Sequence, residues 1–300
     1  MILKSLFFLP KERKIAIERW LRGWQQYRML RRADCVVVSF GKSGRTWLRV
    51  MLSRFYQTEH GLSKRHLIGF DNLHRKNRAI PRFLFTHDNY VKDYTGNTDS
   101  KVDYYDKKII LLVRSPADVA VSQYFQWRYR MKPAKKDLND YPEHGNEVSI
   151  FDFVVGPNGG LPKIIDFMNG WAREIPRIEN ILVVRYEDMR ENPEQVLSGV
   201  LDFIGTPGAP DQIGEAVHFA SVENMRKLEA KRTFRLTGGR LTPKDRSNPD
   251  SYKVRRAKVG GYRDYFSTPE VAEIDTFVQS HLSPAFGYDR AGAPARAVGA

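Results

Sequence analysis

The sequence of 300 residues contains a single cysteine, Cys35. One cysteine excludes an intramolecular disulfide, a disulfide-stabilised scaffold and a zinc site built only from cysteines. The chain also lacks any run that approaches the roughly 18 apolar residues needed for a membrane span. An apolar run at residues 5–9 is too short for a secretory signal, and Lys11 and Arg13 follow it closely. These absences predict a cytoplasmic protein that is soluble or peripheral to a membrane.

Negative charge is scarce compared with positive charge. The chain has 35 Asp and Glu against 49 Lys and Arg, which gives a formal net charge of +14. Such a surplus attracts nucleic acid, acidic lipid or a phosphorylated small molecule, and charge alone does not choose among them. Hydrophobic residues make up 41% of the chain. That content is enough for a sizeable core, so a wholly disordered chain is excluded.

A basic amphipathic helix is predicted in the N-terminal region, residues 1–33. Between residues 15 and 30, apolar side chains recur at helical spacing with arginines between them, namely Ile17, Trp20, Leu21, Trp24 and Tyr27. Packing of this helix on its own domain is the favoured interpretation. Contact of residues 1–32 with an anionic membrane is the alternative, because basic helices with tryptophans favour that interface.

The remainder of the chain has the pattern of an α/β fold. Continuous apolar, β-branched runs at residues 35–40, 109–113 and 181–186 are each followed by a helical pattern. This order predicts a parallel central sheet flanked by helices. We assign residues 34–290 to one domain, with long functional loops at 131–148 and 233–251, and expect a disordered tail at 291–300.

Two segments at predicted strand ends have the composition of phosphate sites. The first is the turn at residues 41–46, GKSGRT, which links a strand to a helix, where backbone N–H groups and the helix dipole favour an anion. Its lysine precedes the last glycine, so it is not the G-x-x-x-x-G-K-[ST] loop of ATPases. The second has Arg114 after a strand and Ser122 eight residues later. Asp118 is interpreted as a helix-start carboxylate.

These segments resemble those of the sulfotransferases that use 3′-phosphoadenylyl sulfate (PAPS). FGKSGRTWL at residues 40–48 is similar to the 5′-phosphosulfate loop, and RSPADVAVSQY at 114–124 is similar to the 3′-phosphate segment. RYEDM at 185–189 and the segment from Arg255 to Phe266 resemble two further family segments. The resemblance implies a P-loop NTPase-like sulfotransferase fold, with PAPS as donor, adenosine 3′,5′-bisphosphate (PAP) as product, and no metal.

The resemblance also implies roles for individual residues. Lys42 takes the position of the lysine that stabilises the departing nucleotide phosphate. Contacts to the 5′-phosphate fall on Ser43, Gly44, Arg45, Thr46 and Trp47, and contacts to the 3′-phosphate fall on Arg114, Ser122, Arg255 and Arg256. Tyr186 takes the position beside the adenine. Lysine and backbone dipoles are suited to the charge that develops on the leaving group.

A histidine is the predicted general base. Residues 81–88, PRFLFTHD, indicate a strand ending at His87 and resemble the family's K-T-H segment. Neutral imidazole can remove a hydroxyl proton because its ordinary pKa of about 6.5 is close to physiological pH. His74 and His144 are the alternatives. Phe85 stands where soluble members have lysine, and Arg45, in place of a threonine, is a candidate to restore that charge.

Other departures concern the late segment, where Ala257 replaces a glycine and Gly261 and Tyr262 replace Asp-Trp. The family's dimerisation pattern is not matched, so no oligomeric state is predicted.

The sequence therefore predicts sulfuryl transfer to an acceptor hydroxyl, and polar, basic, tyrosine-bearing loops favour a carbohydrate or glycolipid. Two alternatives stay open. One is a kinase-like enzyme using ATP and Mg²⁺, in which Asp188, near a strand end, is the candidate carboxylate to hold the metal ion. The other is a basic protein that binds nucleic acid or a membrane. Nucleic acid is not the expected partner.

Overall fold

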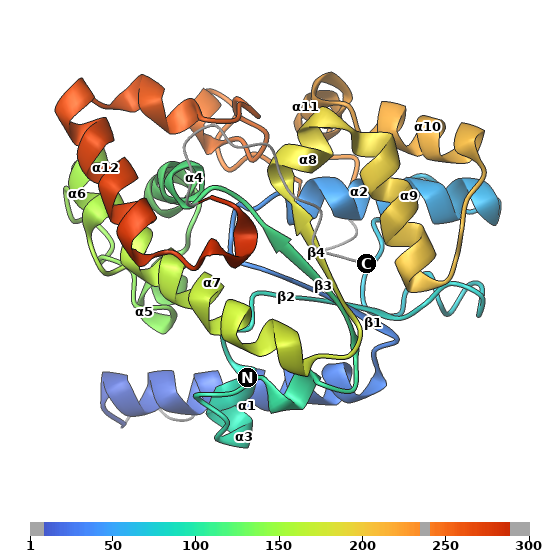
Figure 1. The fold of residues 1–300 in the computed structure, drawn as a ribbon, viewed down its shortest axis with the longest axis horizontal. Helices are drawn as coiled ribbons and strands as arrows, with labels where there is room; N and C mark the ends of the chain where they lie inside the picture. The colour runs from blue at the N-terminus through green and yellow to red at the C-terminus, as the bar shows by residue number, and fades with distance from the viewer. Residues whose placement is uncertain (1–8, 235–240, 289–300) are drawn as a thin grey trace.

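The computed structural model describes residues 9–234 and 241–288. Its centre is a parallel sheet of four strands in the order β2-β1-β3-β4. The strands are β1 (Cys35–Ser39), β2 (Phe83–Thr86), β3 (Lys108–Val113) and β4 (Ile181–Arg185). Each lies in a segment predicted to be a strand, and helices cover both faces of the sheet (Figure 1). The predicted fold class is therefore confirmed.

Each strand is followed in the chain by a helix, and further helices lie between these units. The α-helices are α1 (Lys11–Arg32), α2 (Arg45–Glu59), α3 (Val91–Thr95), α4 (Pro116–Tyr129), α5 (Pro133–Leu138), α6 (Ile150–Val155), α7 (Leu161–Glu174), α8 (Tyr186–Glu191), α9 (Pro193–Ile204), α10 (Pro210–Phe219), α11 (Val222–Ala230) and α12 (Thr268–His281). Short 3-10 turns are η2 (Val102–Tyr104), η3 (Ile175–Arg177), η5 (Pro249–Ser251), η6 (Gly261–Tyr265) and η7 (Pro284–Phe286).

The two central strands explain why the apolar runs are continuous. All five residues of β1 are buried, and so is every residue of β3 except the first. Alternate side chains point to opposite faces of a strand. Val37 packs with α2, α9 and α10 on one face, whereas Val36 and Val38 pack with α4, α7 and α12 on the other. Both faces need apolar residues, so the strand cannot alternate apolar with polar.

Helix α1 packs on the domain, which is the interpretation favoured from the sequence. It lies against α3, and Gly23 allows the approach, since a Cβ there would lie 2.2 Å from the carbonyl oxygen of Tyr90. Arg19 pairs with Asp93 at 3.1 Å. Trp20 and Trp24 remain 46% and 40% exposed. Contact with a membrane thus stays a prediction for the outer face of α1 alone.

Two predicted irregular segments differ in part from expectation. The 131–148 segment contains a helical turn, α5, which forms because Pro133 opens it and because Lys136 and Leu138 are buried. Residues 241–251 are irregular apart from η5, while residues 235–240 lie outside the described part, as do residues 291–300, for which disorder was expected. Over the described ranges, no helix is both long and apolar enough to cross a membrane.

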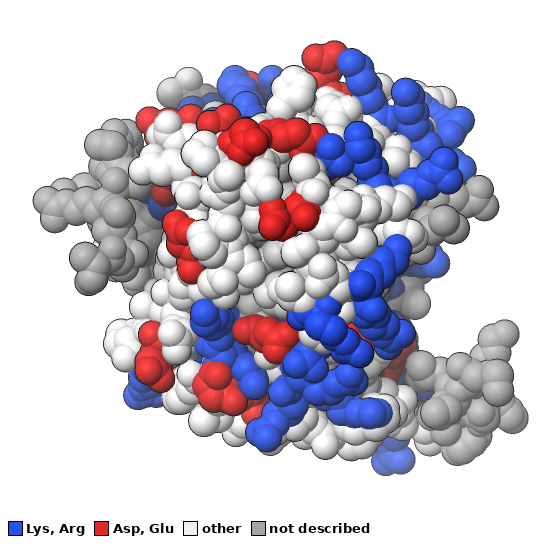
Figure 2. Space-filling model, turned by 90° about the vertical axis from the view of Figure 1, so that its right-hand side faces the viewer, with Lys and Arg blue, Asp and Glu red and all other residues white. Residues whose placement is uncertain are grey.

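Part of the positive surplus lies on the outer surface. Figure 2 shows two groups of Lys and Arg side chains on the face that it presents, and Asp and Glu side chains lie beside the lower group. The lower group lies at the level of α1, whose last turn carries the exposed Arg31 and Arg32.

Candidate active site

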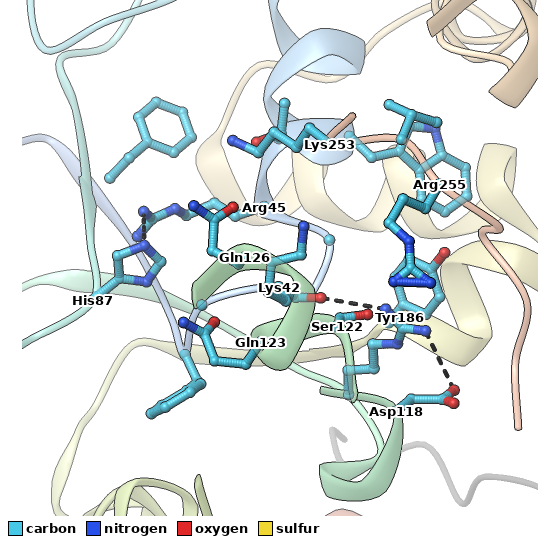
Figure 3. A pocket seen from close by; sticks show the side chains of 18 of the residues that line it. Lys42, Arg45, His87, Asp118, Ser122, Gln123, Gln126, Tyr186, Lys253 and Arg255 are labelled. Atoms are coloured by element: carbon cyan, nitrogen blue, oxygen red, sulfur yellow. Dashed lines mark hydrogen bonds and ion pairs between the residues drawn. The ribbon is translucent and has the colours of Figure 1, made fainter. Parts of the chain in front are cut away.

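The site lies at the edge of the sheet where the strands end. β1 pairs with both β2 and β3 in parallel, so the turns that follow these strands lie side by side. These turns line a cavity of about 660 Å³, together with residues from the start of α8, from the segment 253–262 and from one side of α1. Ligands of open parallel sheets bind at this edge. Figure 3 shows the cavity with Lys42 near its centre.

The β1–α2 turn has the backbone geometry of an anion cradle. Lys42 and Gly44 have φ angles of 73° and 95°, in the left-handed region. A Cβ on Gly44 would lie 2.6 Å from Cδ2 of Tyr186, so only glycine fits there. The first N–H groups of an α-helix have no earlier carbonyl in the helix to bind, and α2 begins directly after Gly44, which lines the cavity. Ser43, predicted to contact the 5′-phosphate, is 2% exposed and is not among the residues that line the cavity.

Lys42 is the cationic side chain at the centre of the cavity. Burial of its ammonium group lowers its pKa from 10.5 to about 7. The positive charges of Arg130, Arg255 and Arg114 lower the pKa of Lys42 further, in that order. The charged form is therefore destabilised in the absence of an anion, and a bound anion would restore it.

Arg114 connects three segments of the site. Its guanidinium group donates to the carbonyl oxygens of Lys42 at 3.3 Å and of Lys258 at 3.1 Å, and pairs with Asp118 at 3.3 Å. It also lies over the ring of Tyr186, 4.3 Å from the centroid. Its buried Nε has no hydrogen-bond partner among the described residues. Arg114 thus holds the turn and the late segment together and keeps one N–H unpaired at the site.

Asp118 has a larger role than the helix-start carboxylate predicted from the sequence. It lies in the first turn of α4, as expected. Besides pairing with Arg114, its two oxygens accept the N–H groups of Gly260 at 2.9 Å and Tyr262 at 3.0 Å. A buried carboxylate is stable when it is paired and hydrogen-bonded in this way. Asp118 therefore fixes the late segment beside the β3–α4 turn.

Aromatic side chains form the wall beyond the turn. Trp47 and Tyr186 meet edge to face, with ring centroids 5.9 Å apart. Arg190 lies over the Trp47 ring at 5.6 Å. The buried Nε1 of Trp47 has no hydrogen-bond partner in the described part of the chain. This wall offers ring faces and one unpaired donor, a combination suited to a purine base.

The late segment brings both of its predicted arginines to the cavity. Arg255 packs against the ring of Phe125, 3.3 Å from its centroid, and pairs with Asp250 at 3.3 Å. Arg256 pairs with Asp264 at 2.6 Å. Ser122 of α4 also lines the cavity, and Figure 3 shows it on the same side of Lys42 as Arg255. The residues predicted around the 3′-phosphate are therefore gathered at one end.

His87 lies at the other end, and its hydrogen bonds define its tautomer. Nδ1 lies 2.7 Å from the carbonyl oxygen of Ser39, and Nε2 lies 2.6 Å from Nη2 of Arg45. A carbonyl only accepts and a guanidinium only donates. The proton therefore sits on Nδ1, and Nε2 carries a lone pair. Burial, and after it the charge of Arg45, hold the pKa of His87 well below 6.5, so the ring is neutral.

Arg45 occupies the place of the missing cation near Phe85. Its guanidinium group also donates to the carbonyl oxygen of Thr86, the residue after Phe85. Arg49 covers the Phe85 ring, 4.1 Å from its centroid. A positive charge is thus present beside the histidine, supplied by α2 instead of β2, as the sequence suggested.

The other two candidate histidines do not line the cavity. His74 contacts the carbonyl oxygen of Ile80 through Nδ1 at 2.7 Å, and His144 is exposed in the segment after α5. His87 is positioned by its neighbours: Asp88 accepts the Tyr104 hydroxyl at 2.7 Å and pairs with Lys101 at 2.7 Å. These bonds fix the turn that presents the imidazole.

Several lining residues were not predicted from the sequence. Gln26 of α1 lies 3.3 Å from the Thr86 hydroxyl, and Arg22 and Met29 of the same helix also face the cavity. Gln123 of α4 lines the cavity as well, and its buried Oε1 has no hydrogen-bond partner among described residues. Helical periodicity shows which residues share a face but not which element that face meets. No local signal could have found them.

Comparison with known proteins decides the family. A family model of the sulfotransferase domain matches residues 32–285. The chain belongs to the sulfotransferase family. Mouse sulfotransferase 2A2 is 21% identical over 276 residues, covering 85% of this chain and 86% of that protein. Cytosolic sulfotransferase 13 of Arabidopsis thaliana is 23% identical over 271 residues, covering 86% of this chain and 79% of that protein.

Solved structures show the same fold. Mouse sulfotransferase SULT7A1 complexed with PAP has a TM-score of 0.57 and 20% identity, and the alignment covers 86% of this chain and 89% of that one. Retinol dehydratase in a complex with retinol and PAP has a TM-score of 0.57 and 17% identity, covering 83% of this chain and 80% of that one. The family and enzyme class predicted from the sequence are confirmed.

Family membership also decides between the enzyme alternatives. The kinase-like alternative gave Asp188 the task of holding a metal ion. In this sulfotransferase Asp188 lies on α8 and does not line the cavity. Burial raises its pKa, which lessens its tendency to carry charge. Neither the kinase nor the non-enzymatic alternative is retained.

Proposed function

We propose that this sulfotransferase transfers the sulfuryl group of PAPS to an acceptor hydroxyl. The observation that supports this best is the placement of Lys42 between two unlike groups (Figure 3). On one side lies His87, with an Nε2 lone pair, and on the other lies the aromatic and cationic pocket of Tyr186 and Arg255. A donor nucleotide and an acceptor hydroxyl can therefore approach the lysine from opposite ends.

The residues present fit the donor. Nε of Arg114 and Nε1 of Trp47, two residues that line the cavity, are buried donors without a hydrogen-bond partner among the described residues, and no side chain caps the start of α2. Buried donors of this kind are rare unless a ligand or water completes them. We assign the 5′-phosphosulfate to the turn at residues 41–47. The 3′-phosphate is assigned to Arg114, Ser122, Arg255 and Arg256, and the adenine to Tyr186 and Trp47.

His87 and Lys42 divide the catalytic work. PAPS supplies a sulfuryl group on a phosphate leaving group. His87 accepts the hydroxyl proton at Nε2, while the bond from Nδ1 to the Ser39 carbonyl keeps the ring oriented. Lys42 becomes fully charged beside an anion and stabilises the negative charge of the departing phosphate. Arg45 must leave Nε2 before the hydroxyl can reach it.

A carbohydrate or glycolipid is our proposed acceptor. The cavity is lined by Asn89, two residues after His87, and by Tyr141, and both carry hydrogen-bonding groups suited to sugar hydroxyls. The Arabidopsis relatives are named cytosolic sulfotransferases, and a single buried cysteine suits a reducing compartment. A cytosolic location is therefore part of the proposal.

Calorimetric titration with PAP, beside ATP and Mg²⁺, tests the donor. We expect saturable PAP binding and weak or no ATP binding. An enzyme that binds ATP with Mg²⁺ more tightly than PAP would contradict the proposal. Transfer is then measured as PAP release from PAPS in the presence of glycans, glycolipids, phenols and steroids, and preference for a phenol or steroid would contradict the acceptor class.

The variant His87→Ala separates chemistry from donor binding. Loss of a general base lowers kcat by about 100- to 10,000-fold. PAP affinity should stay within about twofold, because the imidazole lies at the opposite end of the cavity from Tyr186 and Arg255. His74→Ala is the matched control and should leave kcat unchanged. Near-normal turnover by His87→Ala would move the base elsewhere.

A further inference from the structure

Three buried polar atoms of the cavity-lining residues have no hydrogen-bond partner in the described part of the chain. Two of them are donors, Nε of Arg114 and Nε1 of Trp47, and the third is an acceptor, Oε1 of Gln123. The donors suit the oxygen and nitrogen atoms of a nucleotide. An acceptor atom cannot bind the oxygens of an ionised phosphate or sulfate, because those oxygens are acceptors too. Gln123 therefore needs a ligand group of another kind.

The carboxamide of Gln123 is buried and unpaired. Only 3% of the residue is exposed, and neither Oε1 nor Nε2 is hydrogen-bonded to another residue that the structure describes. Gln57 of α2 is 2% exposed, but its Nε2 donates to the carbonyl oxygen of His66. An unpaired buried amide is unfavourable, so such groups in native proteins generally bind a ligand or water. The amide of Gln123 thus indicates a ligand contact in the cavity.

Gln123 lies toward the base and away from the 3′-phosphate residues. Successive residues of an α-helix point about 100° apart, so Ser122 and Gln123 of α4 face different parts of the cavity. Figure 3 shows Gln123 on the His87 side of Ser122. A Cβ on Gly41 would lie 2.9 Å from Oε1 of Gln123, and Gly41 follows closely after Ser39, whose carbonyl oxygen orients His87. The amide therefore lies at the acceptor end.

The acceptor supplies the missing group better than the donor nucleotide does. The N–H and O–H groups of PAPS belong to its adenosine, which is assigned to Tyr186 and Trp47 at the opposite end. The acceptor brings at least one hydroxyl to the His87 side. A hydroxyl can both donate and accept, so it matches either atom of a carboxamide.

We propose that Gln123 positions the acceptor by binding two neighbouring hydroxyl groups, so that the acceptor is a sugar with a vicinal diol at the site of sulfation. An amide presents an acceptor and a donor side by side, and adjacent hydroxyls can donate to Oε1 and accept from Nε2. The last side-chain torsion of glutamine is broad, so the amide can turn toward a ligand. This inference rests on the proposed function, because it concerns the substrate of that same site.

Deoxy sugars test the proposal by removing one hydroxyl at a time. Methyl glucoside and methyl galactoside are titrated calorimetrically into the PAP-saturated wild-type protein, and the tighter of the two is compared with its monodeoxy analogues. Removal of either of two neighbouring hydroxyls should weaken binding about fivefold or more, the effect of one lost hydrogen bond. Removal of a hydroxyl elsewhere on the ring should have less effect.

The variant Gln123→Met links those hydroxyls to this residue. Methionine is also long and unbranched but has no amide, so the deoxy analogues should bind this variant as well as the parent sugar does. Affinity for PAP should stay within about twofold, since the adenosine lies at the other end. The Tm should stay unchanged or rise, because the substitution removes an unpaired buried amide.

Gln57→Met is the matched control. It removes a buried amide that is paired and that does not line the cavity, so it should lower the Tm and keep the preference for the two hydroxyls. A merely structural role of Gln123 would give this same result in Gln123→Met, with a lower Tm and an unchanged hydroxyl preference.

The inference is wrong if neither parent sugar binds saturably at tens of millimolar, if wild-type protein binds the parent and all deoxy analogues equally, or if Gln123→Met keeps the preference. Each of these results can occur while PAP binds normally, and then only the acceptor assignment is lost. Failure of the wild-type protein to bind PAP would instead refute the proposed function.

Discussion

The depressed pKa of Lys42 makes a quantitative prediction about proton uptake. In the ligand-free protein the pKa of Lys42 is about 7, because of burial and three neighbouring guanidinium groups. At pH 8 such a lysine is protonated in only about one molecule in ten. Bound phosphates favour the charged ammonium and raise the pKa well above 8. Binding of PAP at pH 8 should therefore take up about 0.9 proton per site.

Other groups contribute little at that pH. The phosphates of PAP are already fully ionised, since their second pKa is near 6. His87 is neutral, because burial and Arg45 keep its pKa well below 6.5. Proton uptake is measured from the dependence of the binding enthalpy on the ionisation enthalpy of the buffer. Uptake should fall as the pH is lowered through 7, where Lys42 is already charged before binding.

Lys42→Arg is the control, because arginine stays charged throughout this range and should bind PAP with no linked proton. Uptake near zero in the wild-type protein, or equal uptake in Lys42→Arg, would refute the reasoning. The same pKa has a consequence for stability. Because the unfolded lysine binds more protons than the folded one between pH 7 and 10.5, the ligand-free protein gains stability from Lys42 as the pH rises through that range.

Three further substitutions test the framework of the site. Gly44→Ala places a Cβ against the Tyr186 ring at a φ of 95° and should abolish PAP binding. The control is Gly61→Ala, where φ is 61° and the surrounding space is open, and PAP binding should stay intact. Equal loss of PAP binding in both variants would contradict this expectation. Glu229→Gln removes the counter-charge of Arg130, with which the buried Glu229 pairs. The free energy of unfolding should fall by about 3–5 kcal/mol, measured by thermal unfolding. An unchanged Tm would contradict this expectation. Asp118→Asn removes the charge of the carboxylate that accepts two backbone N–H groups of the late segment. The affinity for PAP should fall at least about tenfold, and proteolysis near residues 258–262 should become faster. Normal PAP affinity together with normal proteolysis would show that Asp118 is dispensable.

The strands and the donor-side segments could be predicted because their signals are local. Residues 35–40 and 109–113 are apolar without alternation, and both β1 and β3 are covered on two faces. The left-handed turn needs Gly44, and a glycine after a strand is visible in the sequence. Arg114 follows the neighbouring strand, so parallel pairing alone brings it to the carbonyl oxygen of Lys42.

The acceptor side could not be predicted in the same way. Arg45 was read from the sequence as a replacement cation, but its bond to Nε2 of His87 depends on β2 pairing beside β1. Lys135 lies in a segment expected to be irregular. Packing of α1 on the domain was expected, but its periodicity did not show that Arg22 lines the cavity. These residues are far apart along the chain and share no spacing.

The sequence by itself determined the strands and the family, and it predicted the donor-side residues, because strand hydrophobicity and turn glycines act over a few neighbouring residues. Only the tertiary structure decided that Arg114 and Asp118 tie the late segment to the turn. It alone placed Arg45 beside the lone pair of His87. Charges from separate elements interact through space, and their distances are fixed only when the elements pack.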